Sequence, residues 1–423
     1  MKLLVLVQVF PPDNVATAQL YGELCLELAA HGWDVRVVST WPHYARDPLA
    51  TAWNRGWTRR FPWSQADHNG IKVIRIAMPD RRPGFLRRVA AWSWWHAASL
   101  AVPLRQWRPD VILCPSPPPS VALVSGHLAR RYGCPFVYNV QELYPDVAIN
   151  LGLVKSALLI SLLRSLERWI YHNAAAITVI SPRMLRAVKE RTAHPDRAVL
   201  IPNFADTDRI RPFDGQNTFV KEFGLENAFV VSYAGNMGKP QQLDTLVRAA
   251  ASLRGDADLR FLFVGSGTEK ANLMRLARQL SAANVSFIPY QPYSRMSEIY
   301  AASHICYVPQ AAGTTTDGVP SKVYRIMAAA RPILAATDAD SDLAVLVRQA
   351  NAGFVVPPTD PEAVACAIRR ARGEGASWLE RGRAGRAHVE QYYSRKVIGM
   401  RYNELLAELA RDSREQKRRS SRA

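Results

Sequence analysis

Apolar runs alternate with amphipathic stretches along the 423 residues of this chain. The apolar runs predict strands at 2–9, 34–40, 72–77, 110–114, 135–140, 175–181, 198–202, 228–235, 259–265, 285–289, 305–309, 332–336 and 353–357. Between them, segments such as 16–32 and 120–133 repeat apolar residues at helical spacing. Strand–helix alternation of this kind predicts α/β architecture with parallel sheets covered on both faces.

The pattern lapses at about 204–226, where the chain is polar and has no clear period. A chain of this length is too long for one ordinary domain. We therefore expect two Rossmann-like domains, at 1–205 and 227–393, joined by a linker at 206–226. A helix at 394–411 is expected to cross back to the first domain, and a basic disordered tail to follow at 412–423.

Composition excludes several classes of protein. The five cysteines are scattered without a CxxC, which favours reduced thiols over a disulfide frame or a zinc site. "MKLLVLVQVFPP" lacks a cleavage site, and no apolar run is long enough to span a membrane. Three Asp-x-Asp triplets occur, at 206–208, 256–258 and 338–340, but chance triplets are expected among 36 acidic residues. We expect no metal site.

One short stretch, "DGVPSKVYRIMAAARPIL" at 317–334, combines a loop, a small helix and a strand. Its helix begins after an acid, a glycine and a proline, with Lys322 in the first turn. A helix N-terminus suits a phosphate, and a lysine there adds a full positive charge. "AGNMGKPQQLDTL" places a second Gly-rich turn and Lys239 before another helix. We expect the two lysines to neutralise one diphosphate. The alternative is that both are ordinary solvated surface residues.

Several motifs together resemble those of a known family: "FPPDNVATAQLYGELCLELAAHGWDVRVVST", "SYAGNMGKPQQLDTLVRAA", "RFLFVGSGTEKANL", "GVPSKVYRIMAAARPILAA" and "AGFVVPPTDPEAVACAI". In order and spacing the chain resembles retaining GT-B glycosyltransferases of the large bacterial polysaccharide family, of family 4 type. It is most similar to the branch of N-acetyl-fucosamine and colanic-acid transferases. The resemblance implies two Rossmann-like domains facing across a cleft, with a nucleotide sugar on the C-terminal domain and the acceptor on the N-terminal one.

The resemblance also implies site residues, with departures. The positions of two glutamates usual in the family are occupied here by Asp317 and Arg325. Asp317 can still accept a hydrogen bond from a sugar hydroxyl, whereas Arg325 cannot make the usual contact with the ribose. The usual diphosphate-binding Arg and Lys fall on Asn236 and Gln241, which leaves Lys239 and Lys322 as the nearest replacements. The remaining donor-side positions implied are Gly235, Gly265, Gly318 and Ser321.

The acceptor side carries further candidates. Near the first helix, the family's glycine pair is replaced by "NVATA", which makes Asn14 and Ala16 the acceptor-side candidates. Gln141 stands where the family has a histidine. Glu142 and Asp146 follow the strand at 135–140, and an acceptor hydroxyl must lose its proton to a base. The resemblance therefore implies catalytic roles for Glu142, Asp317 and Gln141. Helix capping or pairing with an arginine remains an equal alternative for the two loop carboxylates.

Residues 81–108 hold six arginines and four of the eleven tryptophans. Apolar residues bracketed by Arg are typical of a helix lying in a membrane interface. We expect Arg87, Arg88, Trp92, Trp94 and Trp95 to form a face on anionic lipid, with a buried crossover helix as the alternative. The net charge of +18 agrees with an anionic partner, although an Arg-rich proteome would also produce it.

Together these features predict a hexosyltransferase-type enzyme that needs no cofactor besides its nucleotide-sugar substrate. By resemblance the donor is a UDP-linked N-acetylated hexosamine and the acceptor a polyprenyl-diphosphate-linked saccharide. The expected location is the cytoplasmic face of a bacterial membrane, in the synthesis of O-antigen, capsule or exopolysaccharide. The alternatives are a nucleotide-sugar epimerase of similar fold and, from charge alone, a nucleic-acid-binding protein, although no nucleic-acid partner is expected.

Overall fold

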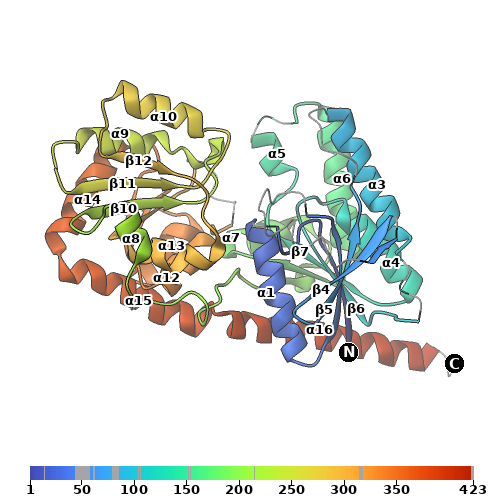
Figure 1. Cartoon of the computed structure of the whole chain (residues 1–423). Coiled ribbons are helices and arrows are strands. Elements are labelled where there is room, and N and C mark those ends of the chain that lie inside the picture. Colours follow the sequence, from blue (N-terminus) through green and yellow to red (C-terminus); the bar gives the residue numbers. More distant parts are fainter. Residues whose placement is uncertain are drawn as a thin grey trace. The chain divides into compact units, whose positions relative to one another are not determined.

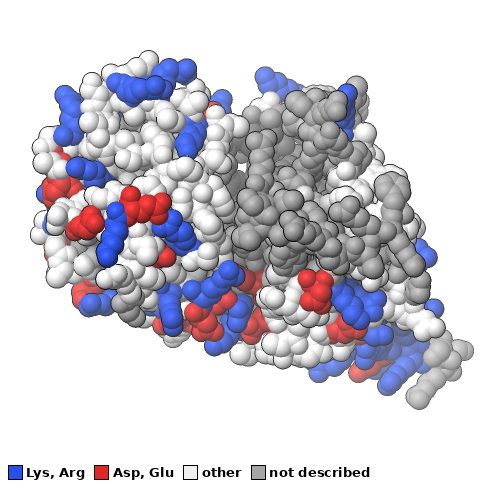
Figure 2. All heavy atoms as spheres, in the orientation of Figure 1, with Lys and Arg blue, Asp and Glu red and all other residues white. Residues whose placement is uncertain are grey.

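The computed structural model describes residues 1–13, 15–42, 58–60, 62–78, 85–102, 104, 106–150, 152, 154–213, 215–313 and 318–420. The chain forms two compact units. Unit 1 comprises Met1–Pro202 and Arg395–Ala423, and unit 2 comprises Asn203–Ser394 (Figure 1). On the face shown in Figure 2, basic side chains are interspersed with acidic ones over both units.

Unit 1 is built on a sheet with the strand order β3-β4-β5-β2-β1-β6-β7-β8-β9 in its described residues. Strands β5, β2, β1, β6, β7, β8 and β9 pair in parallel, whereas β3 and β4 add an antiparallel edge. The bounds are β1 Lys2–Leu6, β2 Asp34–Thr40, β3 Thr58–Arg60, β4 Trp63–His68, β5 Ile71–Ile76, β6 Val111–Pro115, β7 Phe136–Val140, β8 Ala176–Val179 and β9 Ala198–Leu200.

Helices cover this sheet, and its largest core lies between the sheet and α3, α4, α6 and α7. Ser156 and Ser181 cap α6 and α7 through their side chains, and Gly133 ends α4 in the left-handed conformation that glycine favours. The bounds are α1 Ala16–Ala30, α3 Phe85–Leu100, α4 Val121–Tyr132, α5 Asp146–Asn150, α6 Ala157–Asn173, α7 Pro182–Arg191, η2 Pro195–Arg197 and α16 Arg395–Ser420.

Unit 2 has a parallel sheet with the order β12-β11-β10-β13-β14-β15 in its described residues. One core packs α9, α10 and α14 on the sheet, and a second packs α12 and α13. The strands are β10 Phe229–Ala234, β11 Leu259–Val264, β12 Val285–Ile288, β13 Ile305–Pro309, β14 Ile333–Ala336 and β15 Gly353–Val356. The helices are α8 Thr218–Glu222, η3 Lys239–Gln241, α9 Asp244–Ser252, α10 Lys270–Gln279, η4 Tyr293–Arg295, α11 Met296–Ala301, α12 Lys322–Ala328, α13 Asp342–Gln349, α14 Pro361–Glu374 and α15 Ala376–Tyr392.

Two predictions about the segments outside the domains differ from the structure. Residues 206–226, expected as a linker, belong to unit 2, where α8 lies and Phe219 is fully buried. The tail expected to be disordered from 412 is helical as far as Ser420. Arg414 anchors this part of α16 by two hydrogen bonds to Asp110, at 3.1 and 2.6 Å, and the basic last turn suits the negative end of the helix dipole.

The prediction that five α3 residues form a membrane face is wrong for Trp95, and Trp94 is only partly exposed. Trp95 is fully buried in the core of unit 1, so it cannot contact a lipid. Trp94 is half-buried and donates its indole N–H to the Ala77 carbonyl at 2.8 Å. Trp92 and Arg87 are exposed, and the Arg88 side chain lies outside the described residues. Within the described part of the chain, no helix is both long and apolar enough to cross a membrane.

A buried arginine fixes the loop between β1 and α1. Arg75 on β5 is fully buried and donates to the carbonyls of Phe10 at 3.4 Å, Thr40 at 3.2 Å, and Pro11. Asp13, also buried, adds a favourable charge interaction. Burial lowers the pKa of Arg75 to about 10, so the guanidinium stays charged at neutral pH. The loop that leads into α1 is therefore held from the sheet.

Replacing this arginine is expected to destabilise unit 1. Arg75→Met leaves the loop carbonyls and the Asp13 carboxylate without the guanidinium, and we expect a loss of about 3–5 kcal/mol in the free energy of unfolding. Urea unfolding followed by circular dichroism measures it. Lys72→Met, at an exposed position of the same strand, should stay within about 0.5 kcal/mol of wild type. Equal effects of the two changes would contradict the role given to Arg75.

Candidate functional site

The sheet of unit 2 changes direction between β10 and β13. From β10 the chain moves outward to β11 and β12, and then returns to the other side of β10 with β13, β14 and β15. In an open parallel sheet, ligands bind outside the carboxyl ends of the strands at such a switch point. The loops after β10, β11 and β13 therefore define the candidate site of this unit.

Lys322 is the cation of this site. As the first residue of α12, it extends over the ring of Tyr233 at the end of β10, with Nζ 3.9 Å from the ring centroid. The same Nζ is 2.9 Å from where a Cβ on Gly235 would lie. In the part of the chain that the structure describes, no carboxylate pairs with Lys322. Burial lowers the pKa of Lys322 to about 7. An anion beside Gly235 would restore the charge that burial disfavours.

Glycines bring the loops after β10 and β11 into backbone contact. Gly235 and Gly265, which directly follow these strands, both have positive φ, at 145° and 137°. A Cβ on Gly265 would lie 2.2 Å from the Gly235 carbonyl oxygen, and one on Gly267 would lie 2.3 Å from the Met237 carbonyl oxygen. The Met237 amide also donates to the Ser266 carbonyl at 2.8 Å. Only glycine fits these positions, so the two loops form one rigid rim.

The remaining residues predicted on this rim differ in how they are placed. Asn236 is exposed, and its carbonyl accepts a hydrogen bond from the Tyr233 hydroxyl at 2.5 Å. Gln241 folds back and accepts from the Gly238 amide at 3.0 Å, which shapes the loop. Lys239 begins η3 and is exposed, and unlike Lys322 it has no contact that holds it toward Gly235 among the described residues.

The loop before α12 is described in part. Asp317 lies outside the described residues, whereas Gly318 and Ser321 are half-buried just before α12. Arg325 is only 9% exposed, and its guanidinium lies 5.2 Å from the centroid of the Tyr293 ring. The side chain is therefore packed within unit 2 and not spread on the surface.

Tyr233 was not predicted from the sequence. It lies near the end of β10, two residues before Gly235, so its ring and the glycine face the same side of the sheet. An aromatic residue two positions before a loop glycine is the signal that was available in "SYAG". Its ring supplies a negatively polarised face that holds Lys322 in place without neutralising it.

In unit 1, a polar network lies at the carboxyl end of β7. Asn139 accepts hydrogen bonds from the Tyr21 hydroxyl at 2.8 Å and from the Gln141 amide at 2.6 Å, and it donates to Thr178 at 2.9 Å. Gln141 is thereby oriented by α1 and β8. Ala16 is exposed as the first residue of α1, and Asn14 lies outside the described residues.

The two carboxylates after β7 have different surroundings. Asp146 is bound by Arg164 and by Arg191, the latter at 2.6 Å, so the alternative of pairing with an arginine is what the structure shows. Glu142 is half-buried beside Tyr144. Burial, and then the Glu142 charge, raise the pKa of Tyr144 to about 12. Glu142 is thus better placed than Asp146 to act as a base.

The Asp-x-Asp triplets have structural contacts. Asp206 accepts from the amides of Asp208 and Arg209, both at 3.1 Å, and Asp258 pairs with Arg372 at 2.6 Å. Asp338 accepts from the Gly313 amide at 2.9 Å. No group of three or more His, Cys, Asp or Glu side chains suited to a metal ion occurs among the described residues.

The lowered pKa of Lys322 predicts a pH dependence of anion binding. The free protein carries the Lys322 charge below pH 7 and loses it above. A bound diphosphate favours the charged form, so binding above pH 7 takes up a proton and becomes weaker. We expect the affinity for UDP to fall by up to about tenfold per pH unit between about pH 7.5 and 9. Calorimetry at several pH values measures it, and Lys322→Met should bind weakly with a flat profile. A flat profile for the wild type would contradict the assignment.

Comparison with known families identifies the class of protein. A model of the glycosyl transferase 4-like domain matches residues 17–203, and a model of glycosyl transferases group 1 matches residues 228–372. With two parallel α/β units and a site at the switch point of the second, the chain belongs to the glycosyltransferases of GT-B fold, and it is a transferase.

The chain is similar to particular members along most of its length. It is 27% identical to the putative colanic acid biosynthesis glycosyl transferase WcaI of Escherichia coli K12, over 88% of this chain and 92% of the relative. It is 26% identical to the probable glycosyltransferase WbjE of Pseudomonas aeruginosa, over 71% and 74%. Among solved structures, HepE from Anabaena in complex with UDP and glucose has a TM-score of 0.71 at 17% identity, covering 96% of this chain and all of that one.

Proposed function

We propose that the enzyme transfers an N-acetylated hexosamine from a UDP-linked donor to a lipid-linked saccharide in the synthesis of a cell-surface polysaccharide, with retention of configuration and without a metal ion or other cofactor. The observation that carries this proposal is Lys322, a cation held by Tyr233 beside the glycine rim at the switch point. Two relatives support the setting: WcaI is named for colanic acid biosynthesis, and WaaG, at 15% identity and a TM-score of 0.68, for lipopolysaccharide biosynthesis.

The chemistry assigns a role to each part of this site. Departure of the nucleoside diphosphate leaves negative charge on its phosphate oxygens and an oxocarbenium-like sugar. Lys322, once protonated, stabilises that charge as it develops, and the glycine rim leaves room for the phosphates beside it. We assign Asp317 to a hydroxyl of the donor sugar, and Glu142, with Gln141 beside it, to the acceptor hydroxyl.

The acceptor and the location of the enzyme belong to the same proposal. A polyprenyl-diphosphate-linked saccharide stays in the membrane, so the enzyme must work at the membrane surface, here proposed as the cytoplasmic face. Exposed Trp92 and Arg87 on α3 agree with an anionic lipid surface.

A ligand panel tests the donor half of this proposal. Thermal unfolding is measured with UDP, GDP, ADP, NAD and a short RNA, each with and without EDTA. A nucleotide at 100 times its dissociation constant adds about 2.7 kcal/mol, which raises the unfolding temperature by a few degrees. We expect a shift with UDP alone, unchanged by EDTA. A flat response to every nucleotide would contradict the proposal, and a shift lost in EDTA would contradict metal independence.

A further inference from the structure

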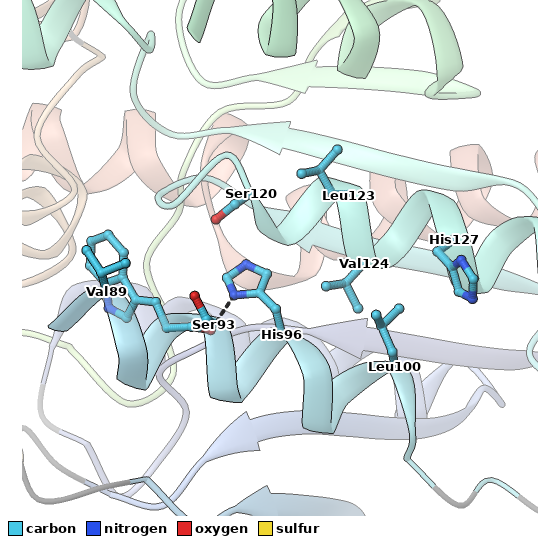
Figure 3. Close-up of a pocket in the computed structure, with 9 residues that line it drawn as sticks. Val89, Ser93, His96, Leu100, Ser120, Leu123, Val124 and His127 are labelled. Atoms are coloured by element: carbon cyan, nitrogen blue, oxygen red, sulfur yellow. Dashed lines mark hydrogen bonds between the residues drawn. The ribbon is translucent and has the colours of Figure 1, made fainter. Parts of the chain in front are cut away.

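A pocket of about 500 Å³, open to solvent, lies between helices α3 and α4 of unit 1 (Figure 3). Val89, Trp92 and Leu100 of α3 and Leu123 and Val124 of α4 form most of its walls. Its volume is in the range of pockets that bind small molecules. None of its lining residues belongs to the candidate site described above.

The walls of this pocket leave apolar surface in water. Val89, Trp92 and Leu123 are 43%, 42% and 43% exposed, whereas most large apolar side chains of the unit are buried. The neighbouring helix α6, which packs on α4, also exposes Leu158 and Leu162, at 72% and 59%, but neither lines the pocket. Apolar side chains left in water around a pocket mark a binding surface.

One polar atom in the pocket has no partner. His96 Nδ1 is 2.5 Å from the Trp92 carbonyl oxygen, to which it donates, and Figure 3 shows the ring turned from α3 toward Ser120 at the start of α4. His96 Nε2 is buried without a hydrogen-bond partner in the described part of the chain. It would accept from a hydroxyl or, when the ring is protonated, donate to a phosphate or ester oxygen. Those groups lie at the headgroup end of a phospholipid chain.

The surroundings of the pocket are basic. The sequences of α3 and α4 contain no Asp or Glu. Arg87 is exposed on α3, and Arg131 at the end of α4 donates to the Leu100 carbonyl at 3.3 Å, beside the pocket. A second copy of this chain would bring the same arginines against one another across a symmetric contact, so it is a poor occupant. An anionic lipid matches both the charge and the apolar walls.

We propose that the pocket between α3 and α4 takes one hydrocarbon chain of an anionic membrane phospholipid, with the headgroup beside His96 and the arginines. The pocket then fastens unit 1 to the bilayer. This inference rests on the proposed function and deepens it, because Trp92 and Arg87 of α3 also belong to the proposed lipid surface.

Flotation of the full chain with vesicles tests the inference. Vesicles contain phosphatidylcholine alone or with phosphatidylglycerol, and binding is compared for the wild type, Val89→Asn/Leu123→Asn in the pocket, and Leu158→Asn/Leu162→Asn on α6. All four positions are exposed, so the changes spare the core. We expect anionic vesicles to be bound, and the pocket variant to bind them at least about tenfold more weakly than the α6 variant. Equal losses in the two variants, or no binding by the wild type, would overturn the proposal.

A spectroscopic measurement places the chain in the pocket. Phosphatidylglycerol brominated in its acyl chains should quench tryptophan fluorescence, and the part due to Trp92 should be lost in Trp92→Phe. Full quenching in Trp92→Phe would overturn the proposal. So would displacement of the brominated lipid by a short polyprenyl phosphate at a lower concentration than by unbrominated phosphatidylglycerol, because the occupant would then be the acceptor tail. UDP affinity, measured on the same samples, reports the proposed function separately.

Discussion

Lys322→Ala is expected to lower kcat/KM for the sugar nucleotide by about 10²–10³-fold, the effect of removing one group that stabilises developing charge. The lysine is held over Tyr233 and beside Gly235, where a diphosphate would lie at the switch point. Its loss removes the charge but little of the packing, so the free energy of unfolding should change much less than turnover does.

Steady-state kinetics and UDP calorimetry check this expectation. Lys221→Ala, at an exposed lysine of the same unit, is the matched control and should behave as wild type. Lys322→Arg keeps the charge, but the larger head group must fit beside the Tyr233 ring, so partial recovery is expected. Turnover of Lys322→Ala within about threefold of wild type would refute the role of the lysine, because this is far below the expected effect.

Gly265→Ala is expected to disrupt the donor site through the backbone. The new Cβ would lie 2.2 Å from the Gly235 carbonyl oxygen, at a residue whose φ of 137° is rarely adopted by other residues. The loop after β10 must move, and Gly235 with it. We expect a loss of at least about 3 kcal/mol in the free energy of unfolding and of measurable UDP binding.

Denaturant unfolding and calorimetry of this variant provide the measurement. Gly255→Ala is the control, because a Cβ at that position meets no atom within 4 Å. It should leave both stability and UDP affinity near those of wild type. If Gly265→Ala bound UDP normally, the rim formed by the two loops would not be part of the donor site.

The sequence predicted most of the sheets because the parallel strands are continuous apolar runs. Every strand expected from those runs is present, from β1 to β15. The strands that were missed, β3 and β4, form an antiparallel edge, and the polar sequence "WSQADH" of β4 lacks the signal of a buried strand. Pairing with β5, and not burial, makes β4 a strand, and such pairing is not visible in a local pattern.

The candidate site was predictable where glycine and charge mark a loop. Lys322 could be chosen from its place in the first turn of a helix, and Gly235 and Gly265 from the family resemblance. The contact of Lys322 with Tyr233 instead joins α12 and β10, which lie far apart in the sequence. Trp95 shows the opposite case. In the sequence it stands three residues after exposed Trp92 and directly after half-buried Trp94, but packing of α3 on the core of unit 1 buries it. Likewise, Arg414 is ordered by Asp110, a partner 304 positions away.

Transfer of labelled sugar is the most direct test of the central claim that this chain is a donor-dependent glycosyltransferase acting on a lipid-linked acceptor. The wild type and Lys322→Ala are incubated with bacterial membranes and radiolabelled UDP-N-acetylhexosamines, with EDTA present, and the label is followed into the lipid extract. We predict lipid-bound label with the wild type and about 10²-fold less with Lys322→Ala. Label that stays in the water phase as a free or epimerised sugar nucleotide, or equal labelling by the two proteins, would contradict the account.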